Sequence, residues 1–213
     1  MKMDSPKVRA GKILPLLQKT YPHARCELNY KSALELLIAT ILSAQCTDAR
    51  VNEVTPALFS KYRTAKDFAK ASSAELEAAV RSTGFYRNKA RSIQNCCTQL
   101  TMEHGGKVPE DMEKLIGLSG VGRKTANLVR AYAFGLPGII CDTHVLRVSE
   151  RLGLTKQKDP DKVEADLAAI VPEGNWTEFS TLIMTHGRRC CAARSPSCPT
   201  CPVLKLCPRY GLT

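Results

Sequence analysis

The sequence lacks any apolar run long enough to cross a membrane. Its richest apolar stretch, residues 34–44, is shorter than the roughly 18 residues that a span needs, and it contains Glu35. The opening residues, MKMDSPKVRAGK, are charged and have no apolar centre of the kind found in secretory signals. No targeting segment is apparent, so we expect a cytoplasmic protein with no membrane partner.

Strand patterns and internal repeats are also missing. No stretch alternates convincingly between apolar and polar residues, and no period of the solenoid kind recurs. A composition of 44% hydrophobic and 24% charged residues excludes disorder and collagen. The length of 213 residues corresponds to one or two domains.

Helical periodicity runs through nearly the whole chain. Ser32 and Ser72, each followed three residues later by glutamate, predict capping boxes, and Asp159 before a proline predicts a third helix start. Gly135 follows a periodic stretch as helix-terminating glycines do. The sequence therefore predicts an all-α fold.

Acidic residues are absent from two stretches of the chain. Residues 114–141 and 186–213 contain four and five Lys or Arg residues, respectively, within a chain of net charge +11. The segment between them is acidic on balance. Concentrated positive charge favours a polyanionic partner, and in a cytosolic protein that partner is most simply a nucleic acid. A basic surface that only improves solubility is the alternative.

Four cysteines gather in a short segment near the C-terminus. Cys191, Cys198, Cys201 and Cys207 are spaced C-x6-C-x2-C-x5-C. In a reducing compartment disulfides are disfavoured, so the pattern predicts a metal centre that also supplies folding energy. Zinc and an iron–sulfur cluster both accept four thiolates, and the wide gaps favour the cluster. We expect the adjacent Cys190 to point away from this site.

A glycine-rich turn separates two predicted helices, residues 110–117 and 123–134. Gly120 and Gly122 allow positive φ angles and a close approach of the backbone to a ligand. The turn leads into a helix N-terminus, which attracts phosphate. Lys124 lies in the first turn of that helix, where the dipole disfavours a cation and so favours the neutral, nucleophilic amine. A plain phosphate contact is an equal alternative for this lysine.

Asp142 follows an apolar run and precedes another predicted helix. It fits the N-cap of that helix, or a carboxylate beside a reacting sugar. Glycoside hydrolysis normally uses two carboxylates, and no second one stands nearby. One aspartate and one lysine amine are another way to break a glycosidic bond.

These segments together resemble the endonuclease III family of the helix-hairpin-helix superfamily, which are bifunctional DNA glycosylases and AP lyases. The resemblance rests on five features, in the family's order: LLIATILSAQCTD at residues 36–48, LSGVGRKTAN at 118–127, CDTHVLRV at 141–148, HGRRC at 186–190, and the four-cysteine tail. It covers residues 10–208. Ser119 stands where the family usually has proline, which leaves the turn less pre-organised.

The resemblance implies two helical domains with a DNA cleft between them. Residues 26–136 would form a six-helix barrel that carries the hairpin, and residues 1–25 with 137–213 a domain that holds a [4Fe–4S] cluster. It makes Lys124 the nucleophile and Asp142 the catalytic carboxylate. The implied cluster ligands are Cys191, Cys198, Cys201 and Cys207. The implied DNA contacts are Gln45, Phe85, Gly120, Gly122 and Arg194.

The implied activity is base-excision repair of duplex DNA. A bacterial-type, monomeric enzyme would excise oxidised pyrimidines and then cleave the abasic site by β-elimination through a lysine Schiff base. Two rivals remain. One is an adenine-excising mismatch glycosylase of the same superfamily, which typically lacks the hairpin lysine. The other is a DNA-binding module without activity, in which Lys124 contacts phosphate and the cysteines hold zinc.

Overall fold

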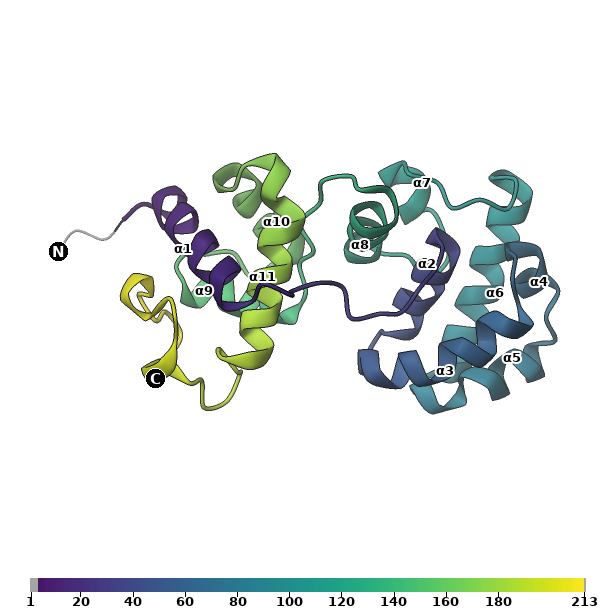
Figure 1. Ribbon diagram of the computed structural model, residues 1–213. Helices are drawn as coiled ribbons and strands as arrows, with labels where there is room; N and C mark the ends of the chain where they lie inside the picture. The colour runs from purple at the N-terminus through teal and green to yellow at the C-terminus, as the bar shows by residue number, and fades with distance from the viewer. Residues whose placement is uncertain (1–3, 213) are drawn as a thin grey trace. The chain divides into compact units, whose positions relative to one another are not determined.

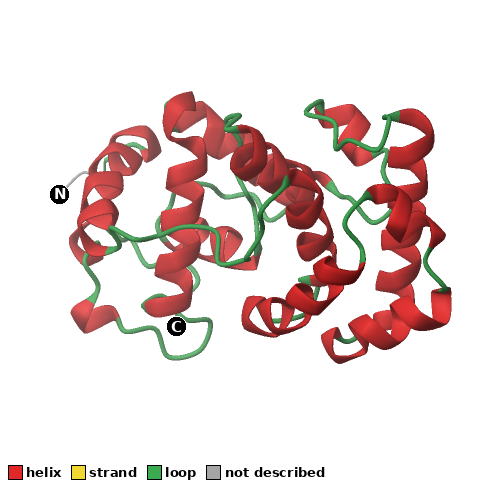
Figure 2. Cartoon of the chain, turned by 45° about the vertical axis from the view of Figure 1, so that its right-hand side comes forward, coloured by secondary structure: helices red, strands yellow, loops and turns green. Residues whose placement is uncertain are grey.

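The computed structural model describes residues 4–212, and within them every regular element is a helix (Figure 2). The described chain divides into two compact units. We call Glu27–Leu136 the central unit, and the described residues up to Cys26 and from Pro137 onward the terminal unit. The all-α prediction is confirmed.

The central unit contains the helices drawn from blue to green in Figure 1. They are α2 (Ala33–Leu42), α3 (Asp48–Lys61), α4 (Ala65–Lys70), α5 (Ser73–Val80), the 3-10 turn η1 (Arg81–Thr83), α6 (Tyr86–Glu103), α7 (Met112–Ile116) and α8 (Arg123–Phe134). Every residue of α2 from Leu36 to Leu42 is buried, which marks a central helix that is covered on all sides. Helices α3, α6 and α8 pack around it.

The terminal unit joins one N-terminal helix to three later ones (Figure 1). They are α1 (Pro6–Thr20), α9 (Thr143–Arg151), α10 (Pro160–Ile170) and α11 (Trp176–Arg189), with short 3-10 turns η2 (Glu173–Asn175), η3 (Cys198–Thr200) and η4 (Leu204–Leu206). Within this unit, the buried Arg9 links α1 to the segment that follows α9. Its guanidinium donates to the main-chain carbonyls of Leu152 and Gly153, both at 2.8 Å.

The helix boundaries follow local sequence signals in most places. Asp159 caps α10 through two hydrogen bonds to main-chain amides, and Gly135 ends α8 with a φ of +67°. Ser32 caps α2, but the carboxylate of Glu35 accepts from the amide of Lys31 rather than from Ser32, so the box is incomplete. The capping box predicted at Ser72 is wrong, because that side chain makes no capping hydrogen bond.

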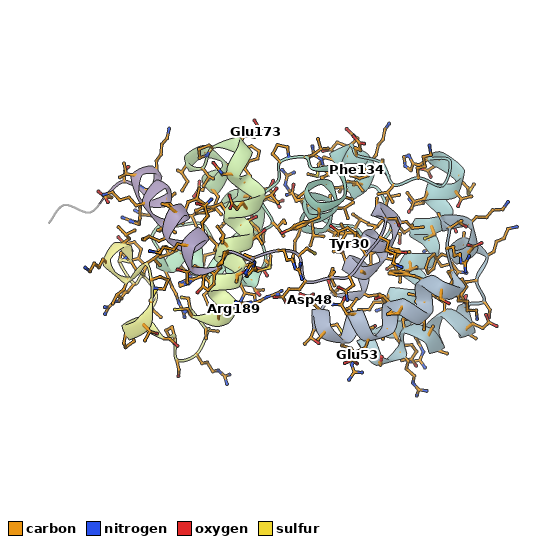
Figure 3. The ribbon with its side chains drawn as sticks, in the orientation of Figure 1. Tyr30, Asp48, Glu53, Phe134, Glu173 and Arg189 are labelled. Atoms are coloured by element: carbon orange, nitrogen blue, oxygen red, sulfur yellow. The ribbon has the colours of Figure 1, made fainter. Side chains whose placement is uncertain are left out.

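Figure 3 labels Tyr30 in the central unit and Arg189 in the terminal unit, each of which makes a contact with a more distant segment of its unit. In the central unit the hydroxyl of Tyr30 donates to the carbonyl of Tyr132 on α8 at 3.1 Å. In the terminal unit Arg189, at the end of α11, places its guanidinium 5.9 Å from the ring centroid of Tyr21. The hydroxyl of Tyr30 is thus hydrogen-bonded, and the ring of Tyr21 lies beside a cation.

Candidate functional site

The glycine turn lies between α7 and α8, as the sequence predicted, and α6 holds it in place. The side-chain amide of Gln99 on α6 accepts from the amide of Ser119 at 2.8 Å and donates to the carbonyl of Gly117 at 3.1 Å. A proline at position 119 has no N–H and could not make the first of these bonds. In this chain Gln99 therefore supplies the order that a proline would otherwise give.

The two glycines of the turn serve different purposes. Gly120 has a φ of +78°, and a Cβ atom there would lie 2.7 Å from the Cβ of Ser92 on α6. Gly122 is the N-cap of α8 with a φ of −97°, which any residue can adopt, and a Cβ there would meet nothing within 4 Å. Both glycines allow a positive φ, but only Gly120 adopts one. The space beside Gly122 opens at the positive end of the α8 dipole.

Lys124 lies in the first turn of α8 with its side chain exposed. Its ammonium has no hydrogen-bond or ion-pair partner within residues 4–212. No side chain caps α8 at this end. A cation at a helix N-terminus is not stabilised by the dipole, and this one is not compensated by a nearby carboxylate. The chain therefore presents a lysine amine that is available to an external reactant.

Asp142 caps α9 in the terminal unit and is only 8% exposed. Its Oδ1 atom accepts from the main-chain amides of His144 and Val145, at 2.9 and 2.8 Å. The capping role is confirmed, and it uses only one oxygen. The cap thus leaves Oδ2 without a hydrogen bond to the described residues.

Gln45 and Phe85, two of the expected DNA contacts, both stand in irregular backbone of the central unit. Their φ angles are 51° and 47°, in the left-handed region that non-glycine residues rarely adopt. Phe85 is 63% exposed, which is unusual for a phenylalanine. Arg194, another expected DNA contact, is exposed on the loop that precedes η3 and makes no hydrogen bond or ion pair with the described residues.

The cysteine-rich tail lines a pocket in the terminal unit. The lining includes five cysteines and two basic side chains: Cys190, Cys191, Cys198, Cys201, Cys207, Arg151 and His186. Burial raises the pKa of the Cys201 thiol to about 11, and burial together with the other thiols raises the pKa of Cys207. Thiolates packed together in this way need a bound cation, and four or more sulfur donors suit a metal centre.

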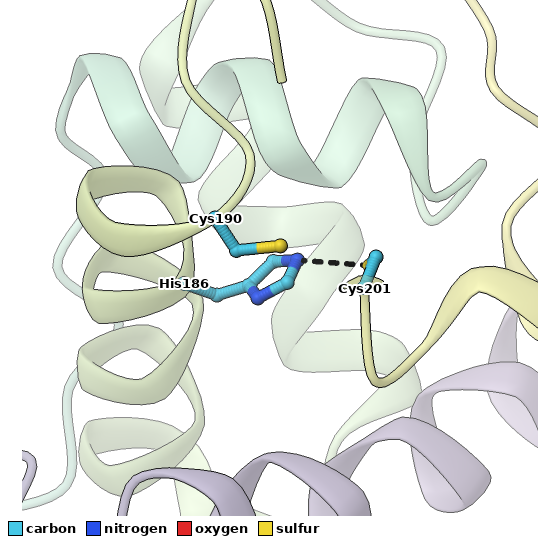
Figure 4. Close-up of side chains that lie close together, drawn as sticks. All are labelled: His186, Cys190 and Cys201. Carbon is cyan, nitrogen blue, oxygen red and sulfur yellow. Dashed lines mark hydrogen bonds between the residues drawn. The ribbon is translucent and has the colours of Figure 1, made fainter. Parts of the chain in front are cut away.

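His186 brings a second type of donor to this pocket (Figure 4). Its Nε2 atom lies 3.6 Å from the sulfur of Cys201, and its Nδ1 atom lies 3.0 Å from the hydroxyl of Tyr21. The ligand atoms of His186, Cys190 and Cys201 all lie within 4.8 Å of one another, close enough to share a metal ion. The prediction that Cys190 points away is wrong, because the last turn of α11 directs its sulfur into the pocket.

Two arginines of α9 shape the loop after Cys190, and neither was among the predicted site residues. Arg151 donates to the carbonyls of Ala192 and Ala193, at 2.7 and 3.0 Å, and its Nη1 atom lies 3.3 Å from the sulfur of Cys191. Arg147 donates to the carbonyl of Cys191 at 3.1 Å. Their i, i+4 spacing beside buried valines is the only signal that could have indicated this role.

Comparison with known proteins identifies the chain. Residues 38–173 match the model of the HhH-GPD superfamily, described as base excision DNA repair proteins. Endonuclease III of Synechocystis sp. is 53% identical over 97% of this chain and 95% of its own length.

Two solved structures agree in sequence and fold. A non-covalent endonuclease III–DNA complex is 48% identical, with a TM-score of 0.92. A trapped endonuclease III–DNA covalent intermediate, also 48% identical, gives a TM-score of 0.93. Each covers 97% of both chains. The chain therefore belongs to the endonuclease III family of DNA glycosylases and AP lyases, within the HhH-GPD superfamily.

Proposed function

We propose that this enzyme removes oxidised pyrimidines from duplex DNA and cuts the resulting abasic site by β-elimination, with Lys124 as the nucleophile. The observation that carries this proposal is an exposed lysine without a partner at the start of α8, directly after the glycine turn. A similar protein has been captured as a covalent DNA intermediate. Covalent capture requires a nucleophile, and an unpaired amine is a suitable one.

The chemistry divides between the lysine and the carboxylate. The amine of Lys124 attacks C1′ of the damaged nucleotide, and the base leaves with the electron pair of the glycosidic bond. The nitrogen, now bonded to C1′, loses a proton, and the C1′–O4′ bond breaks as O4′ takes up a proton, which opens the sugar ring and leaves an iminium ion at C1′. The iminium ion makes the C2′ proton acidic, and loss of that proton expels the 3′ phosphate. Asp142 Oδ2 stabilises the positive charge that develops on the sugar, because a fixed anion acts most strongly where charge forms in the transition state.

The geometry of the central unit and of the tail supports the proposed contacts with DNA. Gly122 allows a phosphate to approach the start of α8, and Arg194 adds a charged contact to the backbone. The damaged nucleotide must leave the helix stack before C1′ can be reached. Gln45 and Phe85, exposed on irregular loops, would fill the gap it leaves. We propose that the enzyme acts as a monomer.

The sulfur-lined pocket fits an iron–sulfur cluster. Cys191, Cys198, Cys201 and Cys207 would hold a [4Fe–4S] cluster, whose part is to cross-link a tail that has little apolar core of its own. On this proposal the terminal unit is the cluster domain and the central unit is the barrel domain of the hairpin. Arg151 and Arg147 set the course of the loop 191–193, which presents Arg194.

The reaction is tested on a duplex that carries one oxidised pyrimidine. We expect free base together with a strand cut that leaves an unsaturated aldehyde at its 3′ end. Release of the base with an intact abasic strand would show a glycosylase without lyase activity. No release of base at all, alongside normal binding, would support the module without activity.

The cluster is tested by metal analysis of protein that is purified without oxygen. We expect about four irons per chain, the number for ligation by four cysteines. Cys198→Ser should lose the iron, whereas Cys190→Ser, which removes the fifth sulfur of the pocket, should retain it. One zinc per chain without iron would contradict the assignment.

A further inference from the structure

Lys89, on α6 of the central unit, is a buried lysine that the mechanism above does not use. Lys89 is only 5% exposed, and its ammonium donates to two main-chain carbonyls, those of Leu42 at 2.8 Å and Thr83 at 2.7 Å. No carboxylate contacts it in the described part of the chain. Burial lowers the pKa of Lys89 from its ordinary value. A buried charge without a counter-ion is costly, so its position calls for an explanation.

The two carbonyls belong to segments that are remote in sequence. Leu42 is the last residue of α2, where carbonyls lack partners within the helix and a cation is favoured by the dipole. Thr83 ends the 3-10 turn η1. One ammonium therefore joins the end of α2 to the end of η1.

Each of these ends leads directly into a residue with unusual backbone. Gln45 stands three residues after Leu42, and Phe85 stands two residues after Thr83. They are two of the four non-glycine residues with positive φ in the described chain, at 51° and 47°. Such conformations persist where the surrounding structure holds them. Phe85 is also the N-cap of α6, and its carbonyl accepts the first helical bond, from the backbone amide of Lys89 at 3.1 Å. Any residue at position 89 would make that bond, so the link specific to lysine is the one from its ammonium.

We propose that Lys89 is a positioning residue that holds the Gln45 and Phe85 loops in one fixed arrangement for insertion into DNA. The inference rests on the proposed function, which assigns these two side chains to the gap left by the damaged nucleotide. Lys89 itself touches neither phosphate nor base. Its contribution is to present both loops preformed, so that their ordering is not required at the moment of binding.

The test compares two substrates and a small set of variants. Lys89→Met removes the ammonium and keeps an unbranched apolar side chain of similar length. Lys89→Arg restores donors to both carbonyls, and Lys66→Met changes an exposed lysine of α4 as the matched control. Single-turnover rates are measured on an oxidised pyrimidine, whose base must be extruded, and on a preformed abasic site, which has no base to unpair. Unfolding curves set a temperature at which every variant is folded.

We expect Lys89→Met to slow excision of the base by about 10- to 100-fold, the scale of a misplaced positioning group. Cleavage of the abasic site should fall by less, and the affinity for undamaged duplex should stay within about 2-fold, since Lys89 contacts no phosphate. Lys89→Arg should recover most of the excision rate. Lys66→Met should behave as the wild type. The double variant Lys89→Met/Phe85→Ala should be no slower than its slower parent.

Two further variants separate the possible failures. If Gln45→Ala and Phe85→Ala leave excision unchanged, the gap-filling role is wrong and the inference falls with it. If they slow excision while folded Lys89→Met does not, the inference alone is wrong. Equal losses on both substrates and in duplex binding would show a merely structural role and also overturn it. If Lys89→Met does not fold, Lys89→Gln takes its place, because its amide can donate to one of the two carbonyls. We expect Lys89→Gln to slow excision of the base by less than Lys89→Met would, with a smaller effect on cleavage of the abasic site. Equal losses on both substrates and in duplex binding would overturn the inference.

Discussion

The two glycines of the hairpin allow a prediction that separates folding from binding. Gly120→Ala places a Cβ atom 2.7 Å from the Cβ of Ser92 and requires alanine to adopt a φ of +78°. The left-handed backbone costs about 1–2 kcal/mol, and a forced contact in a packed region costs about 1–3 kcal/mol. We expect Gly120→Ala to lower the free energy of unfolding by about 2–5 kcal/mol, the sum of these two costs.

Gly122→Ala should leave the fold nearly as stable but weaken DNA binding. Its φ of −97° suits alanine, and the new methyl group meets nothing within 4 Å. The loss of stability should stay below about 1 kcal/mol, the difference between glycine and alanine at an N-cap. The methyl group would, however, stand where a phosphate is proposed to approach the start of α8. We expect the affinity for duplex DNA to fall by about 10-fold, equivalent to one lost charge-assisted hydrogen bond.

Urea unfolding followed by circular dichroism gives the stabilities, and fluorescence anisotropy with a labelled duplex gives the affinities. Ser92→Gly in the Gly120→Ala background removes the contact but not the backbone strain, so it should restore only part of the lost stability. Two results would refute the reasoning. One is a larger loss of stability for Gly122→Ala than for Gly120→Ala. The other is unchanged DNA affinity for Gly122→Ala.

Three further predictions concern charge and protonation. Asp142→Asn keeps a good N-cap and should bind lesion DNA normally while excision slows by orders of magnitude; normal turnover would remove Asp142 from the mechanism. Arg194→Ala should flatten the plot of log affinity against log salt by about one unit, whereas Lys158→Ala, in the acidic segment, should leave it unchanged. Burial raises the pKa of the Cys96 thiol to about 12 from 9.0, and it also raises that of Cys97. The folded state then keeps protons that the unfolded state loses above pH 9. The free energy of unfolding should therefore be unaffected by these thiols below pH 9 and should fall as the pH rises toward 12, by about 1.4 kcal/mol per pH unit for each thiol. Urea titrations of Cys96→Ala should show a shallower fall with pH.

Local signals predicted the parts of this structure that depend on a few neighbouring residues. The second helix of the hairpin begins and ends at Arg123 and Phe134, as expected, because a glycine stands on each side of a periodic stretch. Asp142 caps α9 because its side chain reaches amides two and three residues ahead. Capping and helix termination are interactions within one turn, so a single sequence contains them.

The remaining features depend on contacts between distant segments. The direction of the Cys190 side chain is set by the last turn of α11, and Ser119 is held by Gln99 from another helix. The residues around Lys89 do not indicate that it is buried, because one of its partners, Leu42, lies 47 residues earlier in the chain. Arg151 likewise binds carbonyls about 40 residues further along the chain. No local pattern specifies pairings of this range.

Covalent trapping tests the central claim most directly. Borohydride added to the enzyme and abasic-site duplex reduces a Schiff base to a stable amine link between protein and DNA. We expect wild type to be trapped, Lys114→Ala, in the same acid-free stretch, to be trapped equally, and Lys124→Ala to bind the duplex without being trapped or cutting it. Peptide mapping should place the link on Lys124. Trapping and strand cleavage that persist in Lys124→Ala would show that the amine belongs to another residue and contradict the account.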